Sequence, residues 1–83
     1  MAHFAKIENS KVVEVIVISN DSCGGGNFPD SEPIGQEFIA SIGLDGLWLQ
    51  TSYHASFRSK FAGIGDIFSE ALNEFIDSKI EIL

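Results

Sequence analysis

Residues 12–18 constrain the fold most strongly, because every residue of this run except Glu14 is a β-branched Val or Ile. Such residues disfavour a helix and favour a strand. Strand alternation places Val13, Val15 and Val17 on one side and Val12, Ile16 and Ile18 on the other. Both sides are apolar, which predicts a central strand covered on two faces, or a strand of a small barrel.

A second strand is predicted before this run. The mixed segment Phe4-Ala5-Lys6-Ile7 is followed by the pair Asn9-Ser10, and both residues of that pair are frequent in turns. The pattern predicts an antiparallel hairpin formed by residues 3–8 and 11–19.

Length and composition indicate a single domain over residues 1–83 that has few ways to stabilise itself. A chain of 83 residues, 45% of them hydrophobic, has enough apolar residues for a small core. Cys23 is the only cysteine, so the chain forms no internal disulfide, and His3 and His54 lack the spacing of metal ligands. We therefore expect no metal and no cofactor, and the remaining way to add stability is a homo-oligomer.

Charge excludes further classes of function. The formal net charge of −7 argues against general nucleic-acid binding, which requires a cationic surface. No run approaches the roughly 18 apolar residues of a membrane span. The N-terminus has no apolar core of signal-peptide length, so we expect synthesis in the cytoplasm and no membrane partner.

The middle of the chain is predicted to contain a loop and then a helix. Residues 20–30, here called the glycine loop, contain Gly24-Gly25-Gly26 but lack the Lys-Ser/Thr of a phosphate-binding loop. A helix is predicted over 33–42, with Gly43 as its C-terminal cap. Its predicted apolar face consists of Ile34, Phe38, Ile39 and Ile42, and its predicted solvent-facing residues are Glu32, Gln36, Glu37 and Ser41.

A third strand is predicted over 47–53, after the Asp45-Gly46 turn, and residues 54–60 are predicted to form a loop. The final stretch is ambiguous. Apolar residues spaced by three and four over 67–80 favour a helix, although Ile67-Phe68 and Glu74-Phe75-Ile76 also fit two short strands.

Three motifs carry a resemblance to a known family: Met1-Ala2-His3-Phe4-Ala5, Trp48-x-Gln50-Thr51-Ser52-Tyr53, and Phe57-Arg58-x-Lys60-Phe61-Ala62-x-Ile64-Gly65. Over residues 1 to about 78 the chain resembles small uncharacterised proteins of marine cyanobacterial tailed phages and marine metagenomes. The resemblance implies a hairpin at 64–69 and 74–78, and we adopt this hairpin over the helix. It also implies a phage gene with a virion-associated or assembly role. The chain departs from the family in lacking a proline-rich tail after residue 78.

No catalytic set is evident from the residue pattern. His54 has no adjacent carboxylate to orient it, and Cys23 has no neighbouring cation to lower its pKa, so a surface histidine and an ordinary thiol are predicted. The aromatic residues exceed what one sheet and a short helix can cover, which predicts association with a partner. The predicted interface residues are Trp48, Tyr53, Phe57, Arg58, Lys60 and Phe61.

Together these features predict an α+β fold: a twisted antiparallel sheet, or partly open barrel, of about five strands with one helix, in the order β-β-α-β-β-β. The expected function is that of a non-enzymatic phage structural or assembly accessory that acts through self-association and contacts with other phage proteins, in the host cytoplasm or in the virion. The alternative is an infection-stage regulator that binds a small ligand or a host factor through the glycine loop and the 53–60 segment.

Overall fold

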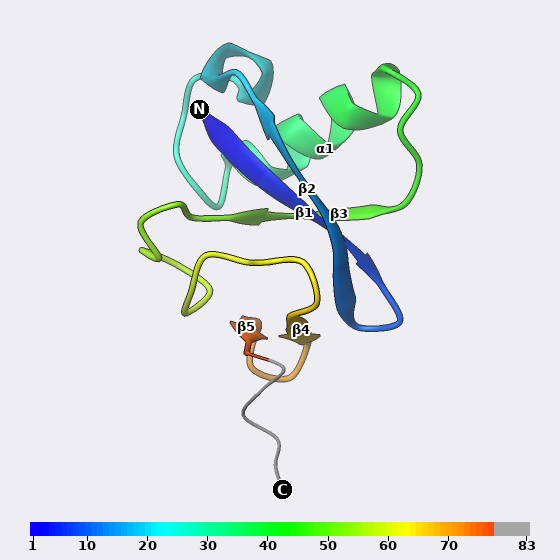
Figure 1. The fold of residues 1–83 in the computed structure, drawn as a ribbon. Coiled ribbons are helices and arrows are strands. Elements are labelled where there is room, and N and C mark those ends of the chain that lie inside the picture. The colour runs from blue at the N-terminus through cyan, green and yellow to red at the C-terminus, as the bar shows by residue number, and fades with distance from the viewer. Residues whose placement is uncertain (78–83) are drawn as a thin grey trace, which may run out of the picture.

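The computed structural model describes residues 1–77 and shows one open antiparallel sheet with one α-helix (Figure 1). The strand order is β3-β1-β2-β4-β5. The elements are β1 (Ala2–Glu8), β2 (Lys11–Ile18), the 3₁₀ turn η1 (Asn20–Cys23), α1 (Ser31–Ser41), β3 (Leu47–Thr51), β4 (Ile67–Ser69) and β5 (Glu74–Ile76). The predicted α+β fold and its element order are confirmed, with a sheet that does not close into a barrel. Within residues 1–77, no helix has the length and apolar character needed to cross a membrane.

The N-terminal hairpin is confirmed. β1 and β2 pair along their full lengths, from Ala2 opposite Ile18 to the pair beside the turn. In the turn, Asn9 and Ser10 have φ values of 53° and 66°, the left-handed conformation that two-residue hairpin turns require. β1 also pairs with β3, over His3 to Ile7, so β1 has a partner along most of both edges.

One extra residue in β2 interrupts its pairing with β1. Lys6 lies opposite Glu14, but the next residue, Ile7, lies opposite Val12. Val13 is therefore left without a partner on β1. An extra residue of this kind is a β-bulge, and it changes which side chains of the strand point to each face.

The bulge decides which β2 side chains are covered. Val12 packs in one core with Ala5 and is only 1% exposed. Val13 and Val17 are 42% and 49% exposed. β2 is the central strand of the five, as predicted, and has side chains in the cores on both faces, but its cover is incomplete because Val13 and Val17 are exposed.

The helix is confirmed within two residues of its predicted ends, but its buried face differs from the prediction. The buried positions are Ser31, Gly35 and Ile39, one turn apart. Ile34 and Ile42, predicted to be buried, are 45% and 53% exposed. The helix approaches the sheet closely at Gly35, where an added Cβ atom would lie 2.3 Å from Cζ of Phe4. A small residue, rather than a large apolar one, therefore determines which side of α1 faces the sheet.

The two faces of the sheet have separate cores. α1 and η1 cover one face, where Ile39 of α1 and Cys23 of η1 are buried against the sheet. The core on this side consists of Ala2, Phe4, Ile18, Cys23, Ile39 and Trp48, with Ile16 and Phe38 partly buried against it. The core on the other side consists of Ala5, Ile7, Val12, Leu49, Ala62, Phe68 and Phe75, with Val15 partly buried against it.

The C-terminal segment is a hairpin, so the helix favoured by periodicity is wrong and the hairpin implied by the resemblance is confirmed over residues 67–76. Phe68 lies opposite Phe75, and the two rings are 7% and 1% exposed. A helix would bury Leu72 on the same stripe, but Leu72 is 62% exposed in the hairpin turn. Residues 78–80 of the predicted helix, and residue 78 of the predicted hairpin, lie outside the described residues.

The chain covers most of its own aromatic rings. Of seven Phe, one Trp and one Tyr, only Tyr53 is exposed, at 64%. The loop from residue 52 to residue 66 provides cover that the sequence did not predict, since Phe57 stacks on Phe28 with the ring centroids 3.9 Å apart. The argument that a single subunit cannot cover its rings is wrong. Self-association itself stays a prediction, but uncovered aromatic rings no longer support it.

Candidate functional site

A polar cleft of about 500 Å³ lies between the glycine loop and the segment that follows β3. Gly25, Gly26 and Asn27 form one wall, and Tyr53, His54, Ser56 and Phe57 form the opposite one. The floor is made by the buried residues Ala2, Cys23, Ser31, Gln50, Thr51 and Ser52. The glycine loop and part of the 53–60 segment are therefore brought together, as the predicted ligand-binding function requires.

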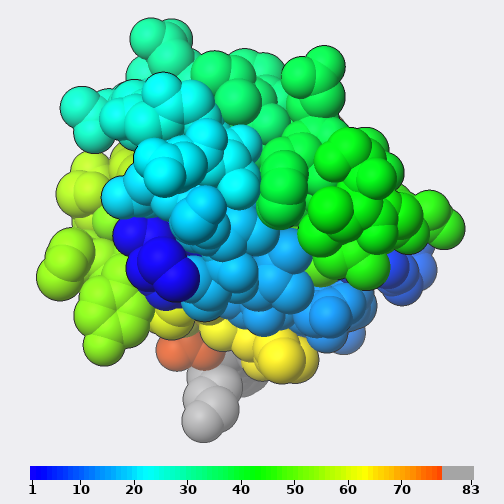
Figure 2. Space-filling view, turned by 90° about the horizontal axis from the view of Figure 1, so that it is seen from above, coloured from blue at the N-terminus to red at the C-terminus, as the bar shows by residue number. Residues whose placement is uncertain are grey.

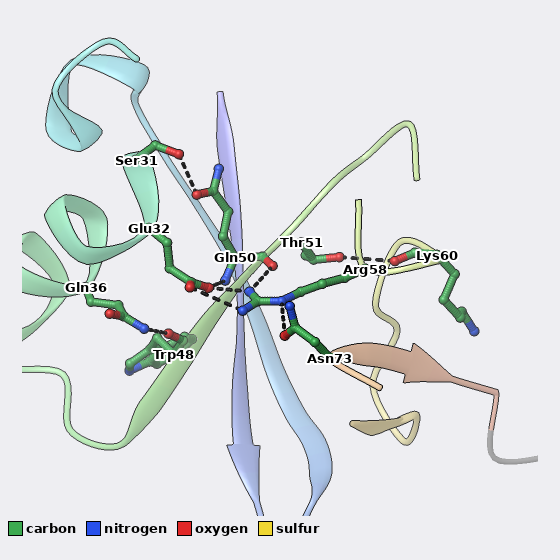
Figure 3. A network of polar contacts seen from close by, with 9 residues as sticks. All are labelled: Ser31, Glu32, Gln36, Trp48, Gln50, Thr51, Arg58, Lys60 and Asn73. Carbon is green, nitrogen blue, oxygen red and sulfur yellow. Dashed lines mark hydrogen bonds and ion pairs between the residues drawn. The ribbon is translucent and has the colours of Figure 1, made fainter. Parts of the chain in front are cut away.

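Gln50 is the central group of the cleft floor. Its residue is 8% exposed, and its side-chain Oε1 accepts a hydrogen bond of 2.7 Å from the Ser31 hydroxyl (Figure 3). Within residues 1–77 its Nε2 group has no hydrogen-bond partner. The cleft floor therefore presents one amide donor that is free to bind an acceptor.

Both histidines of the chain, His3 and His54, line this cleft although they are far apart in sequence. The His3 ring stacks on Tyr53 with a centroid distance of 5.6 Å, and His54 contacts the edge of the same ring at 5.3 Å. Burial, with a contribution from the N-terminal ammonium group, lowers the pKa of His3. His3 is therefore neutral at neutral pH, and His54 is exposed, as predicted.

Cys23 is a buried thiol at the cleft floor. Burial raises its pKa, and the N-terminal ammonium group opposes this shift only in part. A thiol with a raised pKa is protonated at neutral pH and is a poor nucleophile. Among residues 1–77, no group of three or more His, Cys, Asp and Glu side chains is arranged to hold a metal ion.

Beside the cleft, Arg58 is the centre of a buried polar network (Figure 3). Its guanidinium group binds the Glu32 carboxylate through both terminal nitrogens, and the Arg58 and Glu32 side chains are 7% and 15% exposed. Arg58 also donates to the Gln50 carbonyl oxygen at 2.9 Å and to the Asn73 side chain at 3.0 Å. One guanidinium group thus connects α1, β3 and the β4–β5 turn.

The same network satisfies the outer edge of β3. The Gln36 side chain donates to the Trp48 carbonyl oxygen at 2.6 Å, and Glu32 accepts from the Gln50 main-chain N–H at 2.7 Å. Glu32 and Gln36 were predicted to face solvent, and that prediction is wrong. They substitute for a neighbouring strand, because α1 lies beside β3 and presents these two side chains to its main chain.

The six predicted interface residues do not form one exposed surface. Tyr53 is exposed, whereas Trp48 is 4% exposed in the core and the Arg58 side chain is buried in the network. The other three residues have intramolecular partners of their own: Phe57 contacts Phe28, Lys60 pairs with Asp66 at 2.8 Å, and Phe61 contacts His3 and Tyr53. Trp48 and Arg58 thus stabilise the subunit, which corrects their predicted place in an interface.

Sequence reasoning missed Ser31, Glu32 and Gln50 as residues of the site. The count of five basic and twelve acidic residues indicates that Arg58 has an acidic partner, but it does not single out which one. No local pattern identifies Glu32, which is 26 residues from Arg58 in sequence. A comparison with protein-family models, curated proteins and solved structures finds no match to this chain.

Proposed function

We propose that this chain is a non-enzymatic binding protein whose recognition site is the polar cleft beside the glycine loop. The observation that carries this proposal is the free Nε2 group of Gln50 on the cleft floor, in a residue that is 8% exposed. Within residues 1–77 no fully buried side-chain polar atom lacks a partner, so this Nε2 group reaches the solvent of the cleft, where an acceptor atom of a ligand can replace water. The neighbouring Ser31 hydroxyl holds the Gln50 side chain in place for such a contact.

The lining of the cleft favours a neutral ligand. Among the described residues that line it there is no Asp, Glu, Lys or Arg side chain, although these four residue types make up 20% of the chain. The net charge of −7 disfavours anions at long range, and the N-terminal amine of Met1 is the one cation-forming group besides the histidines. A small ligand with carbonyl or hydroxyl oxygens, and a flat part that packs on Tyr53, fits these groups best. A regulator that binds such a ligand is the function this site supports.

Gln50→Leu is expected to weaken ligand binding by about tenfold, because the substitution removes the free donor and keeps an apolar side chain of similar length. The measurement is a titration with uridine and with N-acetylglucosamine, two neutral molecules rich in hydrogen-bond acceptors. NMR chemical shifts of the amide groups report the binding. In the natural sequence we expect shifts of the Gln50 side-chain amide and of the Gly25 and Gly26 amides.

Gln36→Leu is the matched control, since Gln36 donates to a main-chain carbonyl outside the cleft. It is expected to leave the affinity for both probes unchanged. Acetate tests the preference for neutral ligands and is expected to shift these amides less. The proposal fails if neither neutral probe moves the Gln50 side-chain amide.

A second proposed function is the virion-associated or assembly accessory implied by the family resemblance. It is supported by large apolar side chains that are exposed on the subunit, since exposed apolar surface is one source of protein contacts. Those above 40% exposure within residues 1–77 are Met1, Val13, Val17, Ile34, Ile42, Leu47, Tyr53, Ile64 and Leu72. Mass spectrometry of purified particles from the phage that carries the gene is expected to detect the chain, and its absence from particles contradicts this function.

A further inference from the structure

Two strand edges of the sheet are satisfied from within the chain. Along the outer edge of β3, side chains of α1 and the 52–66 loop form hydrogen bonds with main-chain groups of Trp48 and Gln50, as described above. Along the outer edge of β5, the main-chain N–H of Phe75 donates to the Arg58 carbonyl oxygen at 3.1 Å. Main-chain groups that already have partners cannot recruit another strand.

The outer edge of β2, which faces away from β1, is hydrogen-bonded to its neighbour only at its first two residues. β2 pairs with β4 only where Lys11 lies opposite Ile67. Two further hydrogen bonds of 2.8 Å join Val12 to the segment before β4, one with Asp66 and one with Gly65. Past that point, no hydrogen bond within residues 1–77 joins the outer main-chain groups of residues 13–18 to another segment.

This free edge lies at the surface and lacks the usual protection. In Figure 2, β2 (light blue) is exposed between the N-terminus (dark blue) and the segment that follows α1 (green). Natural sheets protect such edges with Lys, Pro or covering segments. Residues 13–18 contain no Pro, and Glu14 is their only charge. The bulge lies at Val13, at the end next to β4, so the strand from residue 14 onward is regular.

Over residues 13–18, β2 contributes a partly buried side chain to each core. On the helix-covered face this side chain is Ile16. On the opposite face it is Val15. A strand added at this edge must therefore be apolar on both faces to complete both cores. β2 itself has this property, because residues 15–18 are all Val or Ile.

We propose that two copies of this chain associate through antiparallel pairing of their β2 edges over residues 13–18, which joins two five-stranded sheets into one. The inference does not depend on the cleft, and it holds whether or not the protein enters a particle. It replaces the predicted 48–66 interface with a main-chain interface on the opposite edge of the hairpin. Main-chain hydrogen bonds provide affinity, and the added Val and Ile contacts extend both cores.

Charge restricts the register of this pairing. Antiparallel pairing about a twofold axis places a residue directly opposite its own copy at the axis, and residues that face each other lie on the same side of the sheet. An axis at Glu14 would set two carboxylates against each other, which is unfavourable. The axis is therefore expected at Val15 or at Ile16, where Glu14 faces an apolar residue near the end of the paired stretch.

The test is sedimentation equilibrium of the full chain over a dilution series, with Val17→Lys as the variant. The natural sequence is expected to be a dimer, and Val17→Lys is expected to raise the dimer dissociation constant at least about tenfold, because lysine is a typical protector of exposed edges. Leu47→Lys is a closely matched control. Leu47 and Val17 are each 49% exposed, but Leu47 lies on β3, whose edge is satisfied. Leu47→Lys is expected to leave the dimer intact.

Disulfide trapping provides a second readout that does not rely on a disruptive substitution. A cysteine at the axis faces its own copy at a Cβ separation near that of a disulfide. Oxidation of Val15→Cys or Ile16→Cys is therefore expected to give a covalent dimer, while Val13→Cys does not. Native Cys23 is buried and is not expected to crosslink. A natural sequence that stays monomeric throughout the dilution series overturns the inference, as does dissociation by Leu47→Lys but not by Val17→Lys.

Discussion

Arg58→Met is expected to lower the free energy of unfolding by about 3–5 kcal/mol, the usual cost of removing one partner of a buried ion pair. The guanidinium group neutralises Glu32, whose side chain is 15% exposed, and it also binds the Gln50 carbonyl oxygen and the Asn73 side chain. Methionine keeps much of the aliphatic length but leaves the Glu32 carboxylate buried and unpaired. Urea denaturation followed by circular dichroism measures the loss.

Two comparisons isolate the charge effect. Lys6→Met removes the cation from the Lys6–Glu8 pair, which spans 3.6 Å, with Glu8 58% exposed, and it is expected to cost less than about 1 kcal/mol. Arg58→Lys is expected to recover only part of the loss, since an ammonium group cannot hold the carboxylate with two parallel hydrogen bonds. An Arg58→Met cost as small as that of Lys6→Met would show that the network adds little stability.

The second large effect is expected for Phe4→Ala, at about 3–5 kcal/mol, because truncating a buried Phe leaves a cavity. Phe4 is 0% exposed, and its ring packs directly over Gly35 of α1. The ring therefore fills the space between β1 and the helix. Urea denaturation of the variant measures the cost, and a loss under about 1 kcal/mol is incompatible with this packing.

The contact between Phe4 and Gly35 also predicts that the stability cost of Gly35→Ala depends on the Phe4 ring. In the natural sequence Gly35→Ala is expected to destabilise the protein by about 1–3 kcal/mol, because the new Cβ atom would overlap the ring. In the Phe4→Ala background the ring is absent and Cys23 Sγ, at 3.0 Å, is the remaining close neighbour of the added Cβ atom, so the same substitution is expected to cost less than in the natural sequence. Gly26→Ala is the control, since no atom lies within 4 Å of its added Cβ. Equal effects of Gly35→Ala in both backgrounds would rule out the contact.

The sequence predicted elements whose signals are local. Asn9 and Ser10 between two apolar runs specify the hairpin, and Pro33 and Gly43 bracket the helix within two residues of its ends. Gly43 has a φ value of 89°, the left-handed conformation expected of a residue just past a helix. Such features depend on a few neighbouring residues, so a single sequence is enough to find them.

Other features depend on contacts between distant residues and were missed. The buried positions of α1 include Ser31 and Gly35, and neither residue type contributes to an apolar pattern. The bulge at Val13 is defined by its partner strand, so strand alternation alone gave the wrong faces for β2. In the C-terminal segment, the spacing of Phe68 and Phe75 fits both a helical stripe and a cross-strand pair. Only the packing of the pair against the sheet distinguishes the two.

In the candidate cleft, too, the parts with local sequence signals were predicted and the parts formed by contacts between distant residues were missed. Its two walls, the glycine loop and the residues after Tyr53, were predicted as segments, because glycine content and lost periodicity are visible in sequence. The floor was not predicted, since Gln50 and Ser31 are 19 residues apart and meet only after α1 packs beside β3.

Satisfaction of the β3 edge by Glu32, Gln36 and Arg58 limits how large an assembly can become. A subunit that could add neighbours at both ends of its sheet would polymerise into an open-ended fibril. In the proposed dimer the pairing edge is the exposed stretch of β2, which lies inside the sheet and not at either end, so one pairing event occupies it. The proposed assembly would therefore stop at a closed pair, and the side chains that satisfy the β3 edge would also oppose open-ended polymerisation.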